Sequence, residues 1–264
     1  MSVSFNLDKR KIKQAFSQAA LTYDGVTQLQ RTVGKALLRD IDNRCISDNV
    51  LDLGCGTGFL TQELLALLPG KQIIALDLAL PMLQAAKAKL KTIDNVIYMC
   101  ADAEQIPITE HAVDHVFSNL MLQWCVDIKA VFMDVRRVLK PGGQLVFSIF
   151  GPQTLQELKQ AWGAVDNYNH VNYFYGMYEL KDFLQQSGFN ILKCQNQLYT
   201  VEYESVLALM RELKNIGAHN VNVSRNKQLT TQRQMQQMIS AYPTCHVTHR
   251  ISATFDVITV ITGR

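Results

Sequence analysis

Four residues have the types and the spacing to hold a ligand: Asp52, Gly54, Gly56 and Gly58. The apolar run VLDL contains the acid, and the helical pattern FLTQELLALL follows the last glycine. This order predicts a buried strand, a tight turn and the start of a helix. Glycine accepts backbone angles that a Cβ forbids, and it lets a ligand lie directly on the main chain. We expect a nucleotide-like ligand here, because a turn without a ligand would not require an acid and three glycines together.

The spacing of these glycines narrows the class of ligand. Dinucleotide-binding turns follow G-x-G-x-x-G, with a pyrophosphate on the helix N-terminus, whereas this turn follows G-x-G-x-G after an acid. An NAD-dependent dehydrogenase is therefore not expected. The stretch resembles the class I S-adenosylmethionine (SAM)-dependent methyltransferases, whose first motif is an apolar strand, an Asp or Glu, and G-x-G-x-G. The resemblance implies SAM as cofactor, S-adenosylhomocysteine (SAH) as its product, and no metal.

Two more acids stand at the ends of the next apolar segments. Asp77 ends segment 71–78, about twenty residues after the last glycine, where an acid can accept hydrogen bonds from both ribose hydroxyls. Its alternative role is to cap the helix that follows. Asp102 follows segment 95–100. The resemblance implies that its carboxylate meets the adenine amino group and that the Ala103 amide meets the ring; the alternative is a turn residue.

The end of the fourth apolar segment, 113–120, completes the expected cofactor site. Asn119 stands where the strand should end, beside the crevice that open α/β sheets use for ligands. The resemblance implies that the main chain here contacts the methionine part of SAM and that the next turn faces the acceptor. Core packing is the alternative for the side chains of that turn, Met121, Leu122, Gln123 and Trp124. The expected cofactor-binding residues also include Leu78 and Met82.

These positions require a sheet whose strands end at one edge. The segments with strand-like patterns are 50–53, 71–78, 95–100, 113–120, 144–150, 189–203 and 251–261. Between a predicted helix, 128–139, and the fifth strand, the residues KPGG predict a turn that stops the helix. Together with the resemblance, this order predicts an α/β, Rossmann-like class I methyltransferase fold. We expect a seven-stranded, mostly parallel sheet with one antiparallel strand, helices on both faces and a helical cap.

The chain carries no internal repeat or low-complexity linker, so we expect residues 1–264 to form a single domain. Two helical segments precede the first strand in an arm of about residues 1–40, and two more lie in an insertion of about residues 204–248. We expect the arm and the insertion to form a cap over the cleft. Tyr23 in the arm would carry a hydroxyl there; the alternative is a packing residue with its hydroxyl at the surface.

Composition and charge exclude several classes of partner. The formal net charge of the 264-residue chain is +3, which is too small to argue for nucleic acid. The start lacks the apolar core of a signal peptide, and no run approaches the roughly 18 apolar residues that cross a bilayer. We therefore expect a cytoplasmic protein without a membrane partner.

The cysteines and histidines do not predict a metal site. The six cysteines are scattered singly, mostly in apolar segments and without C-x-x-C, so we expect reduced core residues. His246 and His249 are three residues apart, which would place them on opposite faces of an expected strand.

Segments outside the cofactor motif point to a narrower family. AFSQAALTYD, SNLMLQWC, GPQTLQELKQAWGAVD and LMRELKNIGAHN resemble the malonyl-[acyl-carrier-protein] O-methyltransferases of biotin synthesis, over nearly the whole chain. The resemblance implies transfer of the SAM methyl group to the free carboxylate of a malonyl thioester, with malonyl-loaded acyl carrier protein or malonyl-CoA as partner. The candidate catalytic residues are Tyr23, Arg211 and His170, with Asn172 and Arg225 as further acceptor contacts. Surface salt bridges or loop packing explain the last four equally well.

Two other functions stay open on the sequence. One is a methyltransferase that acts on a small aromatic, quinone-type or lipid acceptor, which would need a catalytic base. The other is a SAM-binding module without catalysis. The basic residues Lys214 and Lys227 would suit an acidic carrier protein, which neither alternative requires.

Overall fold

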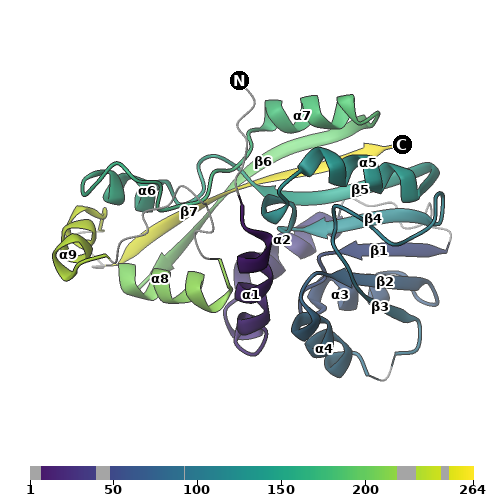
Figure 1. Ribbon diagram of the computed structural model, residues 1–264, viewed down its shortest axis with the longest axis horizontal. Helices are drawn as coiled ribbons and strands as arrows, with labels where there is room; N and C mark the ends of the chain where they lie inside the picture. Colours follow the sequence, from purple (N-terminus) through teal and green to yellow (C-terminus); the bar gives the residue numbers. More distant parts are fainter. Residues whose placement is uncertain (1–6, 40–47, 92, 219–229, 245–249) are drawn as a thin grey trace.

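The structure is a computed structural model, and it describes residues 7–39, 48–91, 93–218, 230–244 and 250–264. Its centre is a seven-stranded sheet in the order β3-β2-β1-β4-β5-β7-β6 (Figure 1). The strands are β1 (Asn49–Leu53), β2 (Gln72–Asp77), β3 (Val96–Cys100), β4 (Val113–Asn119), β5 (Leu139–Phe150), β6 (Asn190–Tyr203) and β7 (Ile251–Gly263).

The pairing of the strands confirms the predicted mostly parallel sheet. All pairs among β1 to β5 are parallel, whereas β7 is antiparallel to both of its neighbours, β5 and β6. From β1 the chain runs to β2 and then β3 on one side, and it returns to β4 on the other side of β1 before it continues to β5. The direction of the strand order therefore reverses between β1 and β4. Ligands bind open α/β sheets in the crevice that such a switch point leaves at the carboxyl ends of the strands.

Helices cover the sheet on both faces. One face carries α2 (Gln28–Arg39), α3 (Phe59–Leu67) and α4 (Leu80–Lys89), and the other carries α5 (Ile128–Val138) and α7 (Met177–Gln186). On β2, Ile73 is buried in the first of these cores and Ile74 in the second, as the alternation of side chains along a strand requires. Because the inner strands are buried on both sides, they appear in the sequence as continuous apolar runs.

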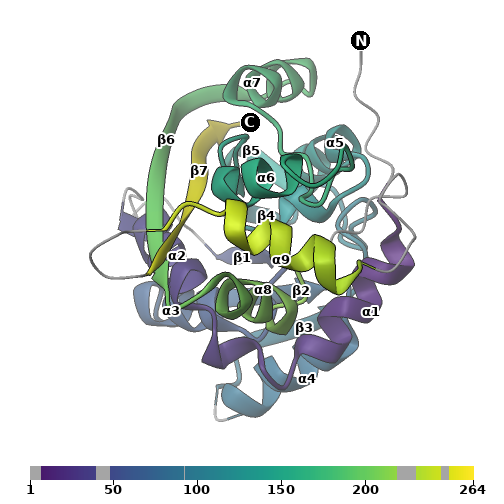
Figure 2. The same ribbon diagram turned by 90° about the vertical axis from the view of Figure 1, so that its left-hand side faces the viewer.

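The long strands β6 and β7 extend past the main sheet and carry a second hydrophobic core. Its helices are α6 (Gln156–Gly163), α8 (Val206–Asn215) and α9 (Gln232–Ala241), which gather at one end of the molecule (Figure 2). Each helix buries a large side chain there, namely Trp162, Leu209 and Met238. Helices α8 and α9 come from the predicted insertion, and α6 joins them.

Helix α1 (Lys9–Ala19) and the short turn η1 (Tyr23–Gly25) connect the two cores. Ala19 and Phe16 pack on Met82 of α4, beside the main sheet. Three residues after Ala19, the Thr22 hydroxyl donates to the carbonyl oxygen of Asn215 in α8 at 3.0 Å. The arm therefore lies across the carboxyl edge of the sheet with a contact on each side.

Two sequence predictions are wrong. Helix α5 ends at Val138, and β5 begins at Leu139 rather than at residue 144. Leu139 pairs with Val113, and the next pair joins Gln144 to His115, so the predicted KPGG turn is a bulge within the strand. Cys100 is exposed rather than buried, because it ends β3 at the edge of the sheet.

Some predictions fall outside the described residues: those for Cys45, Cys245, Arg225, Lys227, His246 and His249. Within the described ranges, no helix has the length and apolar character needed to cross a bilayer. In the same part of the chain, no three His, Cys, Asp or Glu side chains are grouped so that they could hold a metal ion.

Candidate active site

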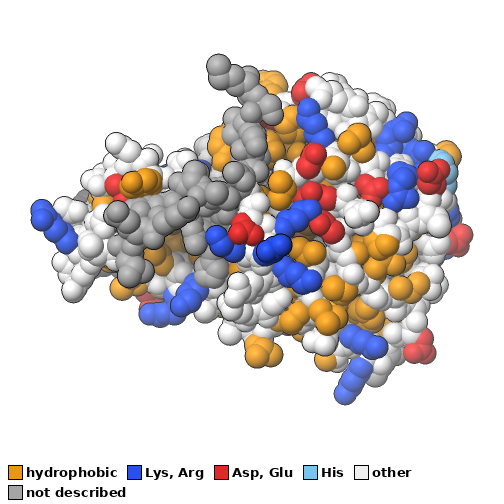
Figure 3. Space-filling view, in the orientation of Figure 1, with side chains coloured by type: hydrophobic (Ala, Val, Ile, Leu, Met, Phe, Trp, Pro, Cys, Tyr) orange, Lys and Arg blue, Asp and Glu red, His pale blue; other side chains and the backbone are white. Residues whose placement is uncertain are grey.

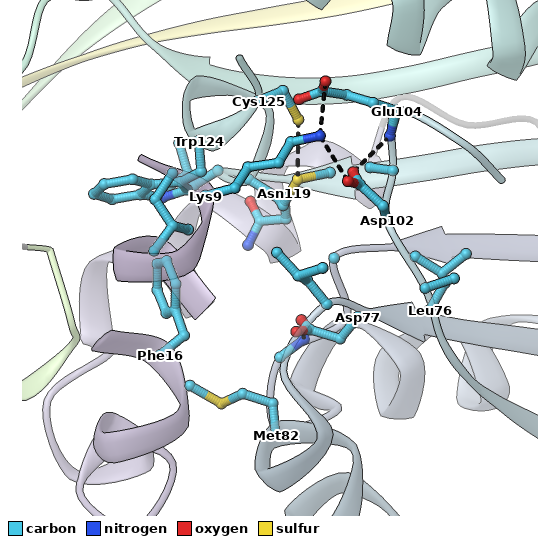
Figure 4. Close-up of a pocket in the computed structure, with 18 of the residues that line it drawn as sticks. Lys9, Phe16, Leu76, Asp77, Met82, Asp102, Glu104, Asn119, Trp124 and Cys125 are labelled. Atoms are coloured by element: carbon cyan, nitrogen blue, oxygen red, sulfur yellow. Dashed lines mark hydrogen bonds and ion pairs between the residues drawn. The ribbon is translucent and has the colours of Figure 1, made fainter. Parts of the chain in front are cut away.

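A cavity opens at the carboxyl ends of β1 to β4, at the switch point of the sheet. Its volume is about 720 Å³ including the open mouth. The floor consists of the turns that follow the four strands, and α1 forms one wall with Ile12 and Phe16 (Figure 4). The lining therefore combines the predicted strand ends with a helix that precedes the sheet in sequence.

The glycine turn after β1 needs glycine for two reasons. Gly54 and Gly58 have φ angles of +78° and +82°, in the left-handed region that favours glycine. A Cβ on Gly54 would lie 2.1 Å from Cγ of Met121, and one on Gly58 would lie 2.9 Å from Cβ of Ala86. Gly54 and Gly56 line the cavity, whereas Gly58 lets helix α3 begin against α4.

The carboxylate of Asp77 is held at the cavity by the main chain. Its two oxygens accept hydrogen bonds from the amides of Gly56, at 2.9 Å, and Ala79, at 2.8 Å. Burial raises the pKa of Asp77, and these amide bonds counter the rise. The carboxylate is thus fixed beside the glycine turn, where a ligand with vicinal hydroxyls would meet it. The N-cap residue of α4 is Ala79, so the alternative prediction that Asp77 caps this helix is wrong.

Asp52, the acid of the glycine motif, lies behind the turn rather than in the cavity. It is 1% exposed, and it accepts a hydrogen bond from the Thr61 hydroxyl at 2.6 Å. Burial raises the pKa of Asp52 to about 7, with the nearby Asp77 adding to the rise. Asp52 lines a separate recess on the other side of Gly54 and Gly56, so the structure assigns it a different position from Asp77 and Asp102.

Asp102 lies on the opposite side of the cavity, in a cluster that the sequence did not predict. The ammonium group of Lys9 lies 2.6 Å from Oδ2 of Asp102 and 2.8 Å from Oε2 of Glu104 (Figure 4). Partial burial works to lower the pKa of Lys9, but the hydrogen bonds to the two carboxylates outweigh it and leave that pKa raised. Ala103 and Leu78 also line the cavity.

Tyr23 lines the cavity from the arm, close to the glycine turn. A Cβ on Gly56 would lie 3.9 Å from the Tyr23 ring. Its neighbour Asp24 accepts a hydrogen bond from the Thr57 hydroxyl at 2.7 Å and pairs with Lys89 at 2.7 Å, which fixes the turn η1. Burial raises the pKa of Tyr23, and the carboxylates of Asp77 and Asp24 raise it further. The hydroxyl is therefore a neutral hydrogen-bond donor at physiological pH.

A second chamber of about 650 Å³ adjoins the first, between the main sheet and the second core. Trp124 lines both cavities. His170 and Asn172 line the second chamber, and the His170 ring stacks on Trp162 at 3.8 Å between centroids, with Nε2 2.8 Å from Asp166. The described residues that line this chamber include no Lys or Arg.

The structure thus brings most of the predicted site residues together, with three exceptions. Tyr23, Asp77, Met82 and Asn119 line the first cavity with the other predicted strand-end residues, and His170 lies in the second chamber. Asp52 and Gly58 support the turn from behind. Arg211 is exposed on α8 and lines neither cavity.

The sequence prediction missed three wall residues, Lys9, Ile12 and Phe16. They follow one another at helical spacing, which places them on one face of α1. That periodicity could have indicated a wall of the cavity. Lys9, however, stands among the basic residues KRKIK, a pattern typical of a helix face that is exposed to solvent.

Residues 51–147 match the family described as methyltransferase domain. The chain is 37% identical over 269 residues to a malonyl-[acyl-carrier protein] O-methyltransferase of Nitrosospira multiformis, covering 96% of this chain and 88% of the relative. It is 38% identical over 251 residues to the biotin biosynthesis bifunctional protein BioHC of Cellvibrio japonicus, covering 95% of this chain and 49% of that longer protein.

The fold comparison agrees with the family match. A crystal structure of a candidate methyltransferase from Bacillus halodurans superposes with a TM-score of 0.64 at 17% identity, covering 88% of this chain and 98% of that chain. At this identity the likeness concerns the fold alone. The relatives decide the family: the chain is a SAM-dependent methyltransferase and belongs to the malonyl-[acyl-carrier protein] O-methyltransferase family.

Proposed function

We propose that this protein transfers the methyl group of SAM to the free carboxylate of a malonyl group carried as a thioester, in an early step of biotin synthesis. The products are the malonyl methyl ester and SAH. The observation that carries the proposal is the extent of the match: it covers 96% of the chain, whereas the general methyltransferase match ends at residue 147. The arm and the helices of the second core are therefore shared with relatives named for this activity.

The cofactor would be held in the first cavity by residues at four strand ends, those of β1 to β4. Gly54 and Gly56 leave the turn without side chains, and Asp77 offers its carboxylate to the ribose hydroxyls. On the opposite side, Asp102 and the Ala103 amide would meet the adenine. Asn119 and its main chain would hold the methionine part. When bound, SAM supplies a methyl group on a sulfonium ion.

The protein has little acid–base work to do in this reaction. The acceptor carboxylate is already ionised near neutral pH, so no residue must remove a proton from it. What the chain must supply is in-line approach at roughly 3–3.5 Å and exclusion of water from the charged nucleophile. The mostly apolar second chamber supplies the exclusion, and the neutral Tyr23 hydroxyl can donate to the acceptor from the wall of the first cavity.

We assign the acceptor to the second chamber, with His170 and Asn172 as its polar contacts. Both lie in the described wall of that chamber, which Trp124 joins to the cofactor cavity. We assign Arg211, which is exposed on α8 and lines neither cavity, to the protein surface rather than to the acceptor site. With Lys214 on the same helix, it forms a basic surface for an acidic carrier protein.

Mass spectrometry of a reaction with SAM and malonyl-loaded acyl carrier protein tests the proposal. We expect the carrier to gain the mass of one CH₂ group, because methyl replaces hydrogen on the carboxyl group. Acetyl-loaded carrier, which has the thioester but no free carboxylate, is the matched control and should gain nothing. If neither carrier gains mass while SAH is released with a quinone-type or lipid acceptor, the substrate is one of those instead.

A further inference from the structure

Helix α1 reaches the cofactor cavity with one charged side chain, that of Lys9. Its ammonium group bridges two carboxylates that follow β3, at 2.6 Å from Asp102 and 2.8 Å from Glu104. The Lys9 and Asp102 side chains are 35% and 33% exposed and that of Glu104 only 14%, so water screens the Lys9–Glu104 pair less than a surface ion pair. Lys9 is 93 residues from Asp102 in sequence, and the cluster therefore joins the arm to the sheet.

The partners of Lys9 are themselves fixed. Oδ1 of Asp102 accepts a hydrogen bond from the Glu104 amide at 3.0 Å, and Oε1 of Glu104 accepts one from the Val126 amide at 2.7 Å. Each carboxylate thus has one oxygen held by the main chain and the other presented to Lys9. Because the acceptors are already ordered, the pairing loses little conformational entropy.

The apolar side of α1 continues the same contact. Phe16 meets Trp124 edge to face, with 5.2 Å between ring centroids, and Ile12 packs in the same cluster. Trp124 lies two residues before Val126 and lines both cavities. The Lys9 cluster and the Phe16 contact therefore attach α1 to the same short segment, which separates the cofactor from the second chamber.

We propose that Lys9 is a positioning residue that fastens α1 over the cofactor cavity, and that this fastening sets the affinity of the protein for SAM and SAH. The inference rests on the assignment of this cavity to the cofactor. Lys9 acts through Asp102, Glu104 and the segment that carries Trp124. It does not need to touch the reacting atoms.

A neighbouring lysine shows what an ordinary surface position on this helix looks like. Among the residues that the structure describes, Lys11 forms an ion pair only with Asp8, at 3.5 Å, and its side chain is 49% exposed. It lines neither cavity. Lys11 therefore provides a control with the same side chain, on the same helix and two residues away.

Calorimetric titration with SAH tests the proposal, because SAH lacks the sulfonium charge and reports the fastening without a direct charge effect. We expect Lys9→Met to weaken SAH binding by about threefold to tenfold, in the range of a partly screened ion pair. Lys9→Arg should restore most of the affinity, and Lys11→Met should bind SAH as the wild type does. Glu104→Gln keeps an acceptor for the Val126 amide but loses the charge, so it should weaken SAH binding as well.

The salt dependence of SAH affinity distinguishes loss of the Lys9 ion pairs from general damage to α1, which would not change that dependence. Between about 0.05 M and about 0.5 M salt, SAH affinity of the wild type should fall, whereas that of Lys9→Met should stay nearly constant. Wild-type SAH affinity and salt dependence in Lys9→Met would overturn the proposal. So would an equal loss in Lys11→Met. Since these titrations contain no acceptor, failure of the malonyl assay would leave them unaffected.

Discussion

At the scale of single residues, the Tyr23 hydroxyl is the group whose chemistry the structure constrains most. Burial and two carboxylates raise its pKa, so it stays protonated well above neutral pH. A phenol in that state donates a hydrogen bond and does not act as a base. Both carboxylates are fixed at the glycine turn beside Tyr23, because Asp24 accepts a hydrogen bond from the Thr57 hydroxyl and Asp77 accepts one from the Gly56 amide.

We expect Tyr23→Phe to lower kcat/KM for malonyl-loaded carrier by about tenfold, the effect of losing one hydrogen bond to a charged acceptor. SAH affinity should change less than about twofold, because the ring that lines the cavity is kept. Steady-state kinetics and calorimetry separate the two quantities. Tyr178→Phe, the same change at an exposed position on α7, is the control.

The raised pKa also fixes the pH dependence. Because the hydroxyl stays protonated above the ordinary tyrosine value of about 10, wild-type kcat/KM should show no titration of Tyr23 between about pH 7 and pH 9.5. A rise in rate over that interval that disappears in Tyr23→Phe would mean that Tyr23 acts as a base, contrary to the assignment.

At the scale of elements, the turn between β1 and α3 is where backbone conformation and close packing coincide. Gly54 has a positive φ, and a Cβ there would meet Met121 at 2.1 Å. Gly70 has nearly the same φ, +80°, but nothing lies within 4 Å of its Cβ position. A comparison of alanine substitutions at Gly54 and Gly70 therefore separates the free-energy cost of the positive φ angle from that of the contact with Met121.

We expect Gly70→Ala to lower the free energy of unfolding by about 1 kcal/mol, the usual cost of a left-handed alanine. Gly54→Ala should cost at least about 2 kcal/mol and should also abolish SAH binding, since the turn must move away from Met121. Urea unfolding and calorimetry measure the two effects. Equal losses of stability in the two variants would show that the Met121 contact does not matter.

The same scale shows what the sequence could and could not predict. The strand ends and the acids beside them were predictable from the sequence, because each apolar run and the acid that follows it lie close together within a single βα unit. The KPGG segment was placed wrongly as a turn, since proline and glycine also occur in a bulge whose ladder continues on both sides. Lys9 was missed because its partners lie more than ninety residues away, and local periodicity says nothing about such contacts.

At the scale of the whole molecule, Lys and Arg side chains lie on the surface in the region of α8 (Figure 3), and the basic residues of that helix, Arg211 and Lys214, line neither cavity. Charge-reversing Lys214→Glu should raise KM for malonyl-loaded carrier by about tenfold, because an acidic partner would be repelled. A malonyl thioester of a short, uncharged thiol should be methylated by this variant at the wild-type rate. Lys87→Glu on α4 makes the same charge change away from α8 and should leave carrier use intact.

Equal carrier kinetics in Lys214→Glu and wild type would remove α8 from the docking surface. The methylation of the short thioester would still stand, so the result would bear on the partner surface alone.

The place of β7 in the sheet has a consequence for the order in which the protein folds. β7 lies between β5 and β6 and pairs with both, although β6 precedes it in the chain. On a growing chain, β6 has no neighbour until β7 emerges from the ribosome, and β5 presents an open edge until then. The second core depends on the same pairing, because it is built on the far ends of these two strands. The β5–β7–β6 side of the sheet and the second core should therefore form together, and protection of their amides against hydrogen exchange should appear only once β7 has emerged.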